Sequence, residues 1–307
     1  MAIDPLPSWN DGVKKQAILD FVATVTADEG DQFVPLADRI ATFDNDGTLW
    51  VEQPLYVQLL FARDRIRALA PVHPEWQEQQ PFAAILANDH DALAKLSKQD
   101  VAALLATVHS GMTTDEFSQI VQDWITTARH PTLDRLYTDC VYQPMLELLD
   151  FLRANDFQTW IVSGGGVDLM RVFAEAVYGI PPAQVIGSSG KVQFELRDGH
   201  PVLVKLPELG SYDDKAGKPA NIHLHIGRQP ILAFGNSDGD QAMLQYTTGA
   251  DGQRLGLILD HDDAEREYDY RIGPLGRLET ALVEAEQQGW VVVSMKEDWA
   301  RIFPWPC

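Results

Sequence analysis

Five short runs of apolar and β-branched residues recur along the chain, and small or acidic turns and helical patterns separate them. The runs are residues 39–43, 159–162, 230–234, 255–259 and 290–295. Strands that alternate with helices predict a parallel sheet covered by helices on both faces. Polar ligands of such a sheet bind at the carboxyl ends of its strands. The predicted fold class is therefore α/β, with a doubly wound parallel sheet and a candidate site just after the runs.

The long stretch between the first and second runs has helical patterns and no strand pattern. Residues 55–69 and 100–109 are candidate helices, and Thr113-Thr-Asp-Glu116 is a capping box ahead of a third. We expect residues 52–140 to form a helical cap domain inserted into a core domain made of residues 1–51 and 141–307. Outside the cap we expect helices over 11–26 and 144–155, and a β-hairpin with strands at 191–196 and 201–206.

The charge balance restricts the possible partners. Lys plus Arg number 24 and Asp plus Glu number 45, so the formal net charge is −21. This charge repels polyanions, and no stripe of Lys and Arg is present, so no nucleic-acid partner is expected. No apolar run approaches the roughly 18 residues of a membrane span, so no membrane partner is expected either. A small phosphate ester can bind only where a local cation and amide donors overcome the overall charge.

The compartment and the oligomeric state stay open at this point. The chain begins Met-Ala-Ile-Asp-Pro-Leu-Pro, without the pattern of a signal peptide. As written this predicts a cytoplasmic protein, or a periplasmic one if the sequence is a mature form. The two cysteines are Cys140 and Cys307, and a disulfide between them is left open.

Two acidic residues follow the first run, in the segment Asp44-Asn-Asp46-Gly-Thr48. An ordinary acidic turn does not explain why two carboxylates follow a buried strand, because their repulsion is costly unless a cation neutralises them. An EF-hand loop starting at Asp44 would need Gly at its sixth position and Glu at its twelfth. Those positions are Leu49 and Leu55, so that interpretation fails.

The Asp-x-Asp-Gly-Thr segment resembles the first motif of the haloacid dehalogenase (HAD) superfamily. Three further motifs of that superfamily follow in order over residues 40–245. The second is Ser163 at a strand end, followed by three glycines. The third is Lys218 near a helix start, with Lys215 as a weaker candidate. The fourth is Gly235-Asn-Ser-Asp-Gly-Asp240 after the next strand. The helical insertion places the chain near the phosphoserine-phosphatase-like branch.

The resemblance implies a magnesium-dependent phosphomonoester hydrolase. Asp44 would be the nucleophile that forms an aspartyl-phosphate, and Asp46 would be the general acid and base. The Ser163 hydroxyl and the Gly164 amide, at a helix start, would hold the phosphoryl oxygens, while Lys218 would offset their charge. The alternatives are a plain N-cap for Ser163 and a solvated surface lysine for Lys218.

The resemblance also implies a Mg²⁺ site. Its ligands would be an oxygen of Asp44, the backbone carbonyl of Asp46 and a group from the fourth motif. Asn236 stands where many relatives have Asp, so it contributes an amide oxygen without charge. Asp240 is the other candidate ligand, either directly or through a water. Asp238 matches no fixed position and could simply face solvent.

Substrate specificity is expected in the cap. Glu52 lies near the position where phosphoserine phosphatases bind the substrate ammonium, and Gln53 competes for that place. A solvent-facing glutamate at a helix start is an equally good interpretation of Glu52. Trp50, Tyr56 and Phe61 could form a box for a quaternary ammonium, or could be apolar cap core. Phosphoserine, phosphocholine and broad acid-phosphatase substrates all remain open.

The motif residues also help to choose among other functions of the same fold. Dehalogenases lack an Asp at the position of Asp46, because halide departure needs no acid. A phosphomutase usually has a smaller cap, and it ranks below hydrolysis. A catalytically inactive binding protein would be favoured by loss of Asp44, Asp46 or Lys218, and all three are present.

Overall fold

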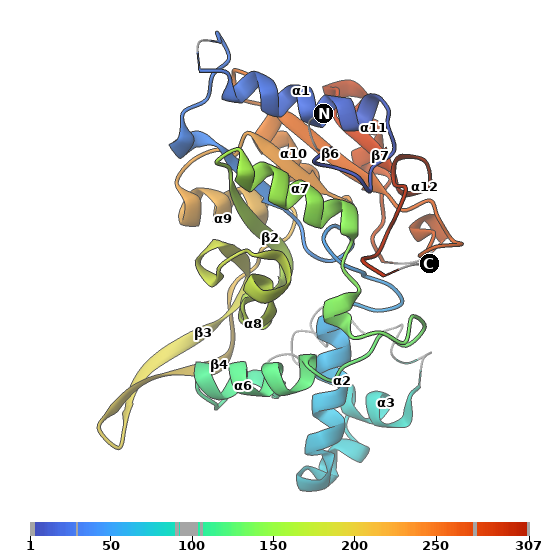
Figure 1. The fold of residues 1–307 in the computed structure, drawn as a ribbon. Coiled ribbons are helices and arrows are strands. Elements are labelled where there is room, and N and C mark those ends of the chain that lie inside the picture. The colour runs from blue at the N-terminus through green and yellow to red at the C-terminus, as the bar shows by residue number, and fades with distance from the viewer. Residues whose placement is uncertain are drawn as a thin grey trace.

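A mostly parallel seven-stranded sheet forms the centre of the computed structural model, which describes residues 4–28, 30–89, 92, 104, 107–272 and 275–305 (Figure 1). The strand order is β4-β3-β2-β1-β5-β6-β7. All neighbours are parallel except β3 and β4, which pair antiparallel. The strands are β1 (Ile40–Phe43), β2 (Gln158–Gly166), β3 (Val185–Arg197), β4 (His200–Ser211), β5 (Leu232–Gly235), β6 (Leu255–Asp260) and β7 (Val291–Ser294). The predicted α/β class is confirmed.

Helices cover both faces of this sheet. One face is covered by α1 (Val13–Thr26), α7 (Gln143–Ala154) and α8 (Val167–Tyr178), and the other by α9 (Gly217–Ile226), α10 (Gln241–Thr248) and α11 (Thr280–Gln288). The insertion between β1 and β2 contains α2 (Val57–Leu69), α3 (Phe82–Ala87) and α6 (Thr114–Ile125), and the short α12 (Met295–Asp298) follows β7 (Figure 1). In the part of the chain that the structure describes, no helix is both long and apolar enough to cross a bilayer.

The two apolar layers follow from the two-residue period of a strand, which sends neighbouring side chains to opposite faces. Ile161 of β2 belongs to the layer under α1, α7 and α8, whereas the next residue, Val162, belongs to the layer under α9, α10 and α11. Phe234 and Ala233 of β5 divide in the same way. The sheet is therefore buried on both faces, as the continuous apolar runs in the sequence predict.

The described residues between β1 and β2 contain helices and turns, and no strand of the sheet. Part of this insertion has a small core of its own, which includes Ile66, Trp76 and Ile85. Its two ends meet at an antiparallel bridge between Trp50 and Val141. Residues 49–51 pair there with 140–142, through hydrogen bonds of 3.1 and 2.9 Å. The division into core and cap domains stays a prediction, and most of the helix expected at 100–109 lies outside the described residues.

The hairpin formed by β3 and β4 is longer than the sequence pattern predicts. β3 starts at Val185 as a parallel partner of β2 and then leaves the sheet as a two-stranded ribbon with β4 (Figure 1). Lys205 of β4 joins this ribbon to the insertion, because its backbone exchanges hydrogen bonds with Gly111 and Met112 at 2.9 Å. Its ammonium forms an ion pair with Asp168 of α8.

Of the two cysteines considered for a disulfide, the structure describes Cys140. Cys140 is a buried free thiol whose Sγ donates to the carbonyl of Leu136 at 3.2 Å. Burial raises its pKa to about 12, so it is a poor nucleophile at neutral pH. Cys307 lies outside the described residues.

The capping box at the start of α6 gives a stability prediction. Thr113 Oγ1 accepts from the Glu116 amide at 3.1 Å, and the Glu116 carboxylate accepts from the Thr113 amide at 2.7 Å. We expect Thr113→Ala to lower the free energy of unfolding by about 1 kcal/mol, because one amide loses its partner. Urea unfolding measures this change. The matched variant Thr114→Ala, one residue into the helix, should change it by less than about 0.5 kcal/mol, and equal effects would contradict the cap.

Candidate active site

Lys218 lies where the first, third and fourth motifs meet. It sits in the first turn of α9 and is 2% exposed. Its ammonium lies 2.9 Å from Asp44 Oδ1 and 2.5 Å from Asp240 Oδ1. Burial acts to lower the pKa of Lys218, but the charges of Asp240 and Asp44 outweigh it and raise the pKa. The surface-lysine interpretation of Lys218 is therefore wrong, whereas Lys215, the weaker candidate, is exposed.

Asp44 follows β1 directly, and its amide donates to the Phe234 carbonyl of β5 at 3.0 Å. Its carboxylate is buried, which raises the pKa of Asp44 to about 7, with the negative charges of Asp240 and Asp46 adding to the effect and that of Lys218 opposing it. Oδ1 lies near the Lys218 ammonium but has no donor in hydrogen-bonding geometry. The carboxylate thus has capacity for a further cationic partner.

Asp46 is held in place by Trp50, whose indole nitrogen donates to Asp46 Oδ1 at 2.7 Å. Trp50 itself stacks on Phe173 of α8 at 4.5 Å between ring centroids. Burial raises the pKa of Asp46 to about 6, and the Trp50 hydrogen bond limits the rise. A carboxyl group with such a pKa can both give and take a proton near neutral pH.

Ser163 comes to the same place from the end of β2. A Cβ atom added to Gly165 would lie 3.6 Å from both Ser163 Oγ and Asp46 Oδ2. The Ser163 and Asp46 side chains therefore both lie beside Gly165. The plain N-cap interpretation of Ser163 is wrong, because α8 begins at Val167 and its N-cap is Gly166. Gly164 likewise lies in β2, not at a helix start as predicted.

Gln58 of α2 is a contact that the sequence did not indicate. Its side-chain oxygen accepts from the amide of Gly166 at 2.7 Å. This bond ties the helical insertion to the end of β2. Because a glutamine in the first turn of a helix has no distinctive pattern, only the fold reveals it.

The fourth motif forms a tight loop around Asp240. Asp240 Oδ2 accepts from the amides of Asn236 and Ser237 at 2.9 and 3.0 Å, while Oδ1 faces Lys218. Both oxygens are therefore engaged. Asp238 has another role, since its Oδ1 accepts from the amides of Glu279 and Ala281 at the start of α11. The solvent-facing interpretation of Asp238 is wrong.

Asn236 and Glu52 form a buried pair. Asn236 Oδ1 accepts from the Thr48 hydroxyl at 2.9 Å, and its Nδ2 donates to Glu52 Oε2 at 3.1 Å. Glu52 is 3% exposed and lies five residues before α2 begins at Val57. A solvent-facing glutamate at a helix start is thus the wrong interpretation. Burial first, then the charges of Asp46 and Asp44, raise the pKa of Glu52 well above its usual range.

Two of the three aromatic residues suggested as an ammonium box, Trp50 and Tyr56, lie by the carboxyl groups, where Tyr56 hydrogen-bonds Glu52. The third, Phe61, lies elsewhere. Trp50 is fixed beside Asp46, whereas Phe61 packs on Phe117 and Trp124 at 5.9 and 5.3 Å between ring centroids. Phe61 is therefore apolar cap core, the alternative weighed from the sequence. Gln53 points elsewhere as well, since its side chain donates to the Leu275 carbonyl at 3.4 Å.

Asp213 is a site residue that the sequence pattern missed. Burial raises its pKa to about 6, and the nearby Lys218 charge and a hydrogen bond from Asn221, at 2.8 Å, oppose the rise. It comes from the segment between β4 and α9, which has no motif. Asp213 is thus a third carboxyl group near the Lys218 ammonium, besides Asp44 and Asp240.

His261, just after β6, is a second missed residue. Its Nε2 lies 2.6 Å from the Gly47 carbonyl, and its Nδ1 lies 3.2 Å from Glu267 Oε2. A carbonyl only accepts, so Nε2 carries a proton. Glu267 in turn accepts from the hydroxyls of Tyr142 and Tyr270 at 3.3 and 3.2 Å. This buried network supports the backbone of the Asp44–Thr48 loop.

The donor set fits a divalent cation of the oxygen-binding kind. Among the described residues, no three His, Cys, Asp or Glu side chains are arranged to hold a metal alone. A cation at this place would therefore use the Asp44 carboxylate together with backbone, amide and water oxygens, as Mg²⁺ often does. Burial raises the pKa values of Asp44, Asp46 and Glu52, and neighbouring carboxylates add to the rise for Asp44 and Glu52. A bound cation would favour the charged form of these buried groups.

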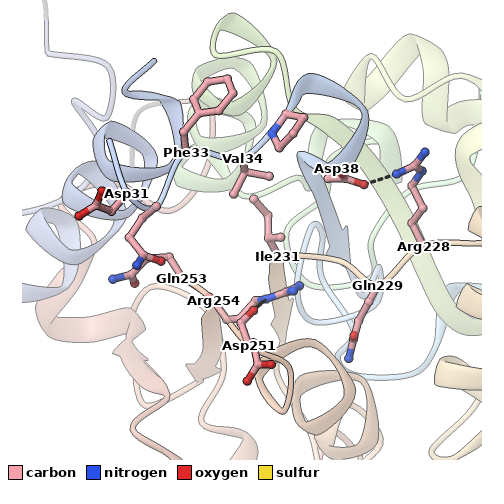
Figure 2. A pocket seen from close by; sticks show the side chains of 13 residues that line it. Asp31, Phe33, Val34, Asp38, Arg228, Gln229, Ile231, Asp251, Gln253 and Arg254 are labelled. Atoms are coloured by element: carbon pink, nitrogen blue, oxygen red, sulfur yellow. Dashed lines mark hydrogen bonds and ion pairs between the residues drawn. The ribbon is translucent and has the colours of Figure 1, made fainter. Parts of the chain in front are cut away.

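A separate open pocket of about 450 Å³ lies at the opposite edge of the sheet (Figure 2). Its lining includes Asp38, Ile231 and Arg254, which directly precede or lie just before β1, β5 and β6. Arg228 is paired there with Asp38. Because the carboxylates described above follow the other ends of these strands, this pocket is not part of the candidate active site.

Comparison with known proteins identifies one family. The model of the haloacid dehalogenase-like hydrolases matches residues 41–245. No curated protein matches the sequence. Solved structures with a similar fold include a protein of unknown function from Bordetella pertussis Tohama I. The two sequences are 14% identical, the match covers 83% of this chain and 97% of that chain, and the TM-score is 0.52. A functionally unknown protein from Anaerococcus prevotii has 15% identity, with 89% and 88% covered and a TM-score of 0.54.

Gly47 gives a prediction for the site's packing. Its φ is +75°, and a Cβ there would collide with Asn236 Nδ2 and lie 2.5 Å from Glu52 Oε2. Gly252 has a φ of +85° but open space around it. We expect Gly252→Ala to lower the free energy of unfolding by about 1–2 kcal/mol through backbone strain alone. Gly47→Ala should lower the free energy of unfolding by clearly more, because the collision adds to the backbone strain. Equal losses in urea unfolding would contradict the close packing around Gly47.

Proposed function

Because the chain belongs to the haloacid dehalogenase-like hydrolases, we propose that it is a magnesium-dependent phosphatase that hydrolyses small phosphate monoesters through an aspartyl-phosphate on Asp44. One observation carries this proposal. The Lys218 ammonium lies between Asp44 and Asp240, at 2.9 and 2.5 Å, inside the protein. A buried cation at this position reduces the repulsion between an attacking carboxylate and an incoming phosphate.

In the first step, an Asp44 oxygen attacks phosphorus as the bond from phosphorus to the leaving oxygen breaks. Asp46 gives its proton to that oxygen, so an alcohol leaves. In the second step, water attacks the phosphorus of the aspartyl-phosphate and gives a proton to Asp46, as the bond from phosphorus to the Asp44 oxygen breaks. Phosphate is released and both carboxyl groups return to their starting state. Asp44, the Asp46 carbonyl and Asn236 would hold a Mg²⁺ ion, which would supply positive charge to the phosphoryl oxygens.

The phosphoryl group would be held from the β2 side. The Ser163 hydroxyl is buried and, among the described residues, accepts one hydrogen bond, from the Gly165 amide at 3.3 Å. Its proton is therefore available to a phosphoryl oxygen. The Gly164 amide is the second donor proposed for this role. Both residues lie in β2 just before Gly166, which Gln58 ties to the helical insertion.

The geometry at Asp46 favours phosphoryl transfer over dehalogenation. A dehalogenase needs no acid for its leaving halide, whereas Asp46 has a pKa of about 6 and is oriented by Trp50. Between Asn236 and Asp240, we propose Asn236 as the direct metal ligand, because Lys218 and two amides already engage the Asp240 oxygens. An inactive binding protein is tested by the turnover experiment below.

Asp44 and Asp46 should have separable kinetic effects on p-nitrophenyl phosphate with Mg²⁺. We expect Asp44→Asn to abolish turnover and covalent labelling by a ³²P-labelled substrate. Asp46→Asn should lower kcat by about 10²–10⁴-fold, because proton transfer is lost, while labelling at Asp44 persists. Acid quench and scintillation counting measure the label. Turnover by Asp44→Asn would refute the nucleophile, and no turnover by the native chain across metals and substrates would favour a binding protein.

Two neighbouring lysines provide a matched pair for the ammonium. Lys218→Met leaves the buried carboxylates without their cation, so we expect loss of phosphatase activity and a fall of about 3–5 kcal/mol in the free energy of unfolding. Lys215→Met changes an exposed residue three positions earlier and should alter neither quantity measurably. Steady-state kinetics and urea unfolding give both readouts. Normal activity in Lys218→Met would contradict the proposed charge balance.

A further inference from the structure

Glu52 is a buried carboxyl group without a cationic side chain beside it. It is 3% exposed, and no ion pair involves it among the residues that the structure describes. The charged side chains that act on Glu52 are Asp46 and Asp44, and both repel its carboxylate. Burying an unpaired carboxylate costs several kcal/mol, so such groups are normally paired with a cation or a metal.

The space around Glu52 leaves little room for a substrate group. Cβ atoms added to Gly47 and Gly276 would lie 2.5 and 2.7 Å from Glu52 Oε2, so both backbones pass close to this oxygen. Both glycines have positive φ, +75° and +64°. Tyr270 also closes the area, because its hydroxyl accepts from the Glu52 amide at 3.2 Å. A substrate ammonium at Glu52, as predicted from the sequence, would have to displace this packing.

The Glu52 carboxyl group has side-chain hydrogen bonds with Tyr56 and with Asn236, the proposed metal ligand. Asn236 Nδ2 donates to Glu52 Oε2 at 3.1 Å, which turns Asn236 Oδ1 toward Thr48. In its ionised form, which a bound cation would favour, the Glu52 carboxylate only accepts, so it fixes which end of the amide is the oxygen. Asn236 Oδ1 keeps a second lone pair after it accepts from Thr48 at 2.9 Å. Glu52 therefore orients a neutral ligand and places a negative charge directly behind it.

We propose that Glu52 is the anionic group that balances the bound divalent cation through Asn236, a ligand that carries no charge of its own. This role rests on the proposed function, since it needs the cation. Glu52 is a positioning residue that touches neither the substrate nor the reacting atoms. Groups behind metal ligands act in this way by orienting the ligand and adding charge, and their loss typically weakens metal binding by about 10–100-fold.

Magnesium affinity of four proteins tests the proposal: the native chain, Glu52→Gln, Asn236→Asp and the double variant, each titrated with MgCl₂ by calorimetry. We expect Glu52→Gln to weaken Mg²⁺ binding by about 10–100-fold. The double variant moves the same charge onto residue 236, so its Kd should return to within about threefold of the native value. Native affinity in Glu52→Gln, or no recovery in the double variant, would overturn the proposal.

Thermal unfolding gives a second readout that does not depend on activity. Asn236→Asp alone brings a second carboxylate to within hydrogen-bonding distance of Glu52. Without Mg²⁺ its Tm should therefore fall, and the rise in Tm on adding Mg²⁺ should exceed that of the native chain. A metal-free Tm equal to the native value would show that residue 236 does not sense the Glu52 charge and would count against the proposal.

Controls separate this proposal from folding and from the proposed function. Glu147→Gln changes a carboxylate of α7 that binds Ser8 at 2.8 and 2.6 Å, and it should keep native Mg²⁺ affinity. Glu52→Asp retains the charge but withdraws it from Asn236, so weaker binding is expected. If Glu52→Gln does not fold, unchanged affinity in Glu52→Asp overturns the proposal. If the native chain binds no Mg²⁺, the proposed function is refuted. If the native chain binds Mg²⁺ and Glu52→Gln binds it with the same affinity, only the role of Glu52 is refuted.

Discussion

The site depends on one buried ammonium surrounded by carboxyl groups. Lys218 is the single cationic side chain found there among the described residues, and its closest partners are Asp44 and Asp240. Each buried ion loses several kcal/mol of hydration, which only close partners can offset. Burial raises the pKa values of Asp44, Asp46 and Glu52, and the one positive charge of Lys218 does not offset this rise. The protein thereby stores an electrostatic imbalance that a divalent cation and a reacting phosphate would relieve together.

Much of this arrangement could be predicted from the sequence, because parallel strands end at the same edge of a sheet. Asp44 and Asp240 come after strands β1 and β5 and meet at Lys218, while Ser163 lies toward the carboxyl end of β2, on the side of Asp46. The start of α8 was misplaced because three glycines after Ser163 resemble a helix start, whereas β2 continues through them. Hydrogen-bonded pairing with β3 decided the local structure there.

Other site residues could not be predicted, since their contacts arise from packing between distant segments. His261 is 214 positions from Gly47, and Glu52 is 184 positions from Asn236. Neither pair has a fixed spacing that a single sequence could reveal. His261 and Asn236 both contact the Asp44–Thr48 loop, at Gly47 and Thr48, and the His261 segment lies beyond the residues that the family model matches. The family motifs thus supply the groups proposed to react, and less recognisable residues hold them.

The bridge between Trp50 and Val141 has a consequence for how this protein can diversify. The insertion leaves and rejoins the sheet at adjacent points, so its contour length adds little to the entropy of closing it, which grows only with the logarithm of length. A longer, shorter or foreign helical module could be exchanged at this junction while β1 and β2 stay in register. Substrate preference could then change over generations without rebuilding the chemistry beneath it.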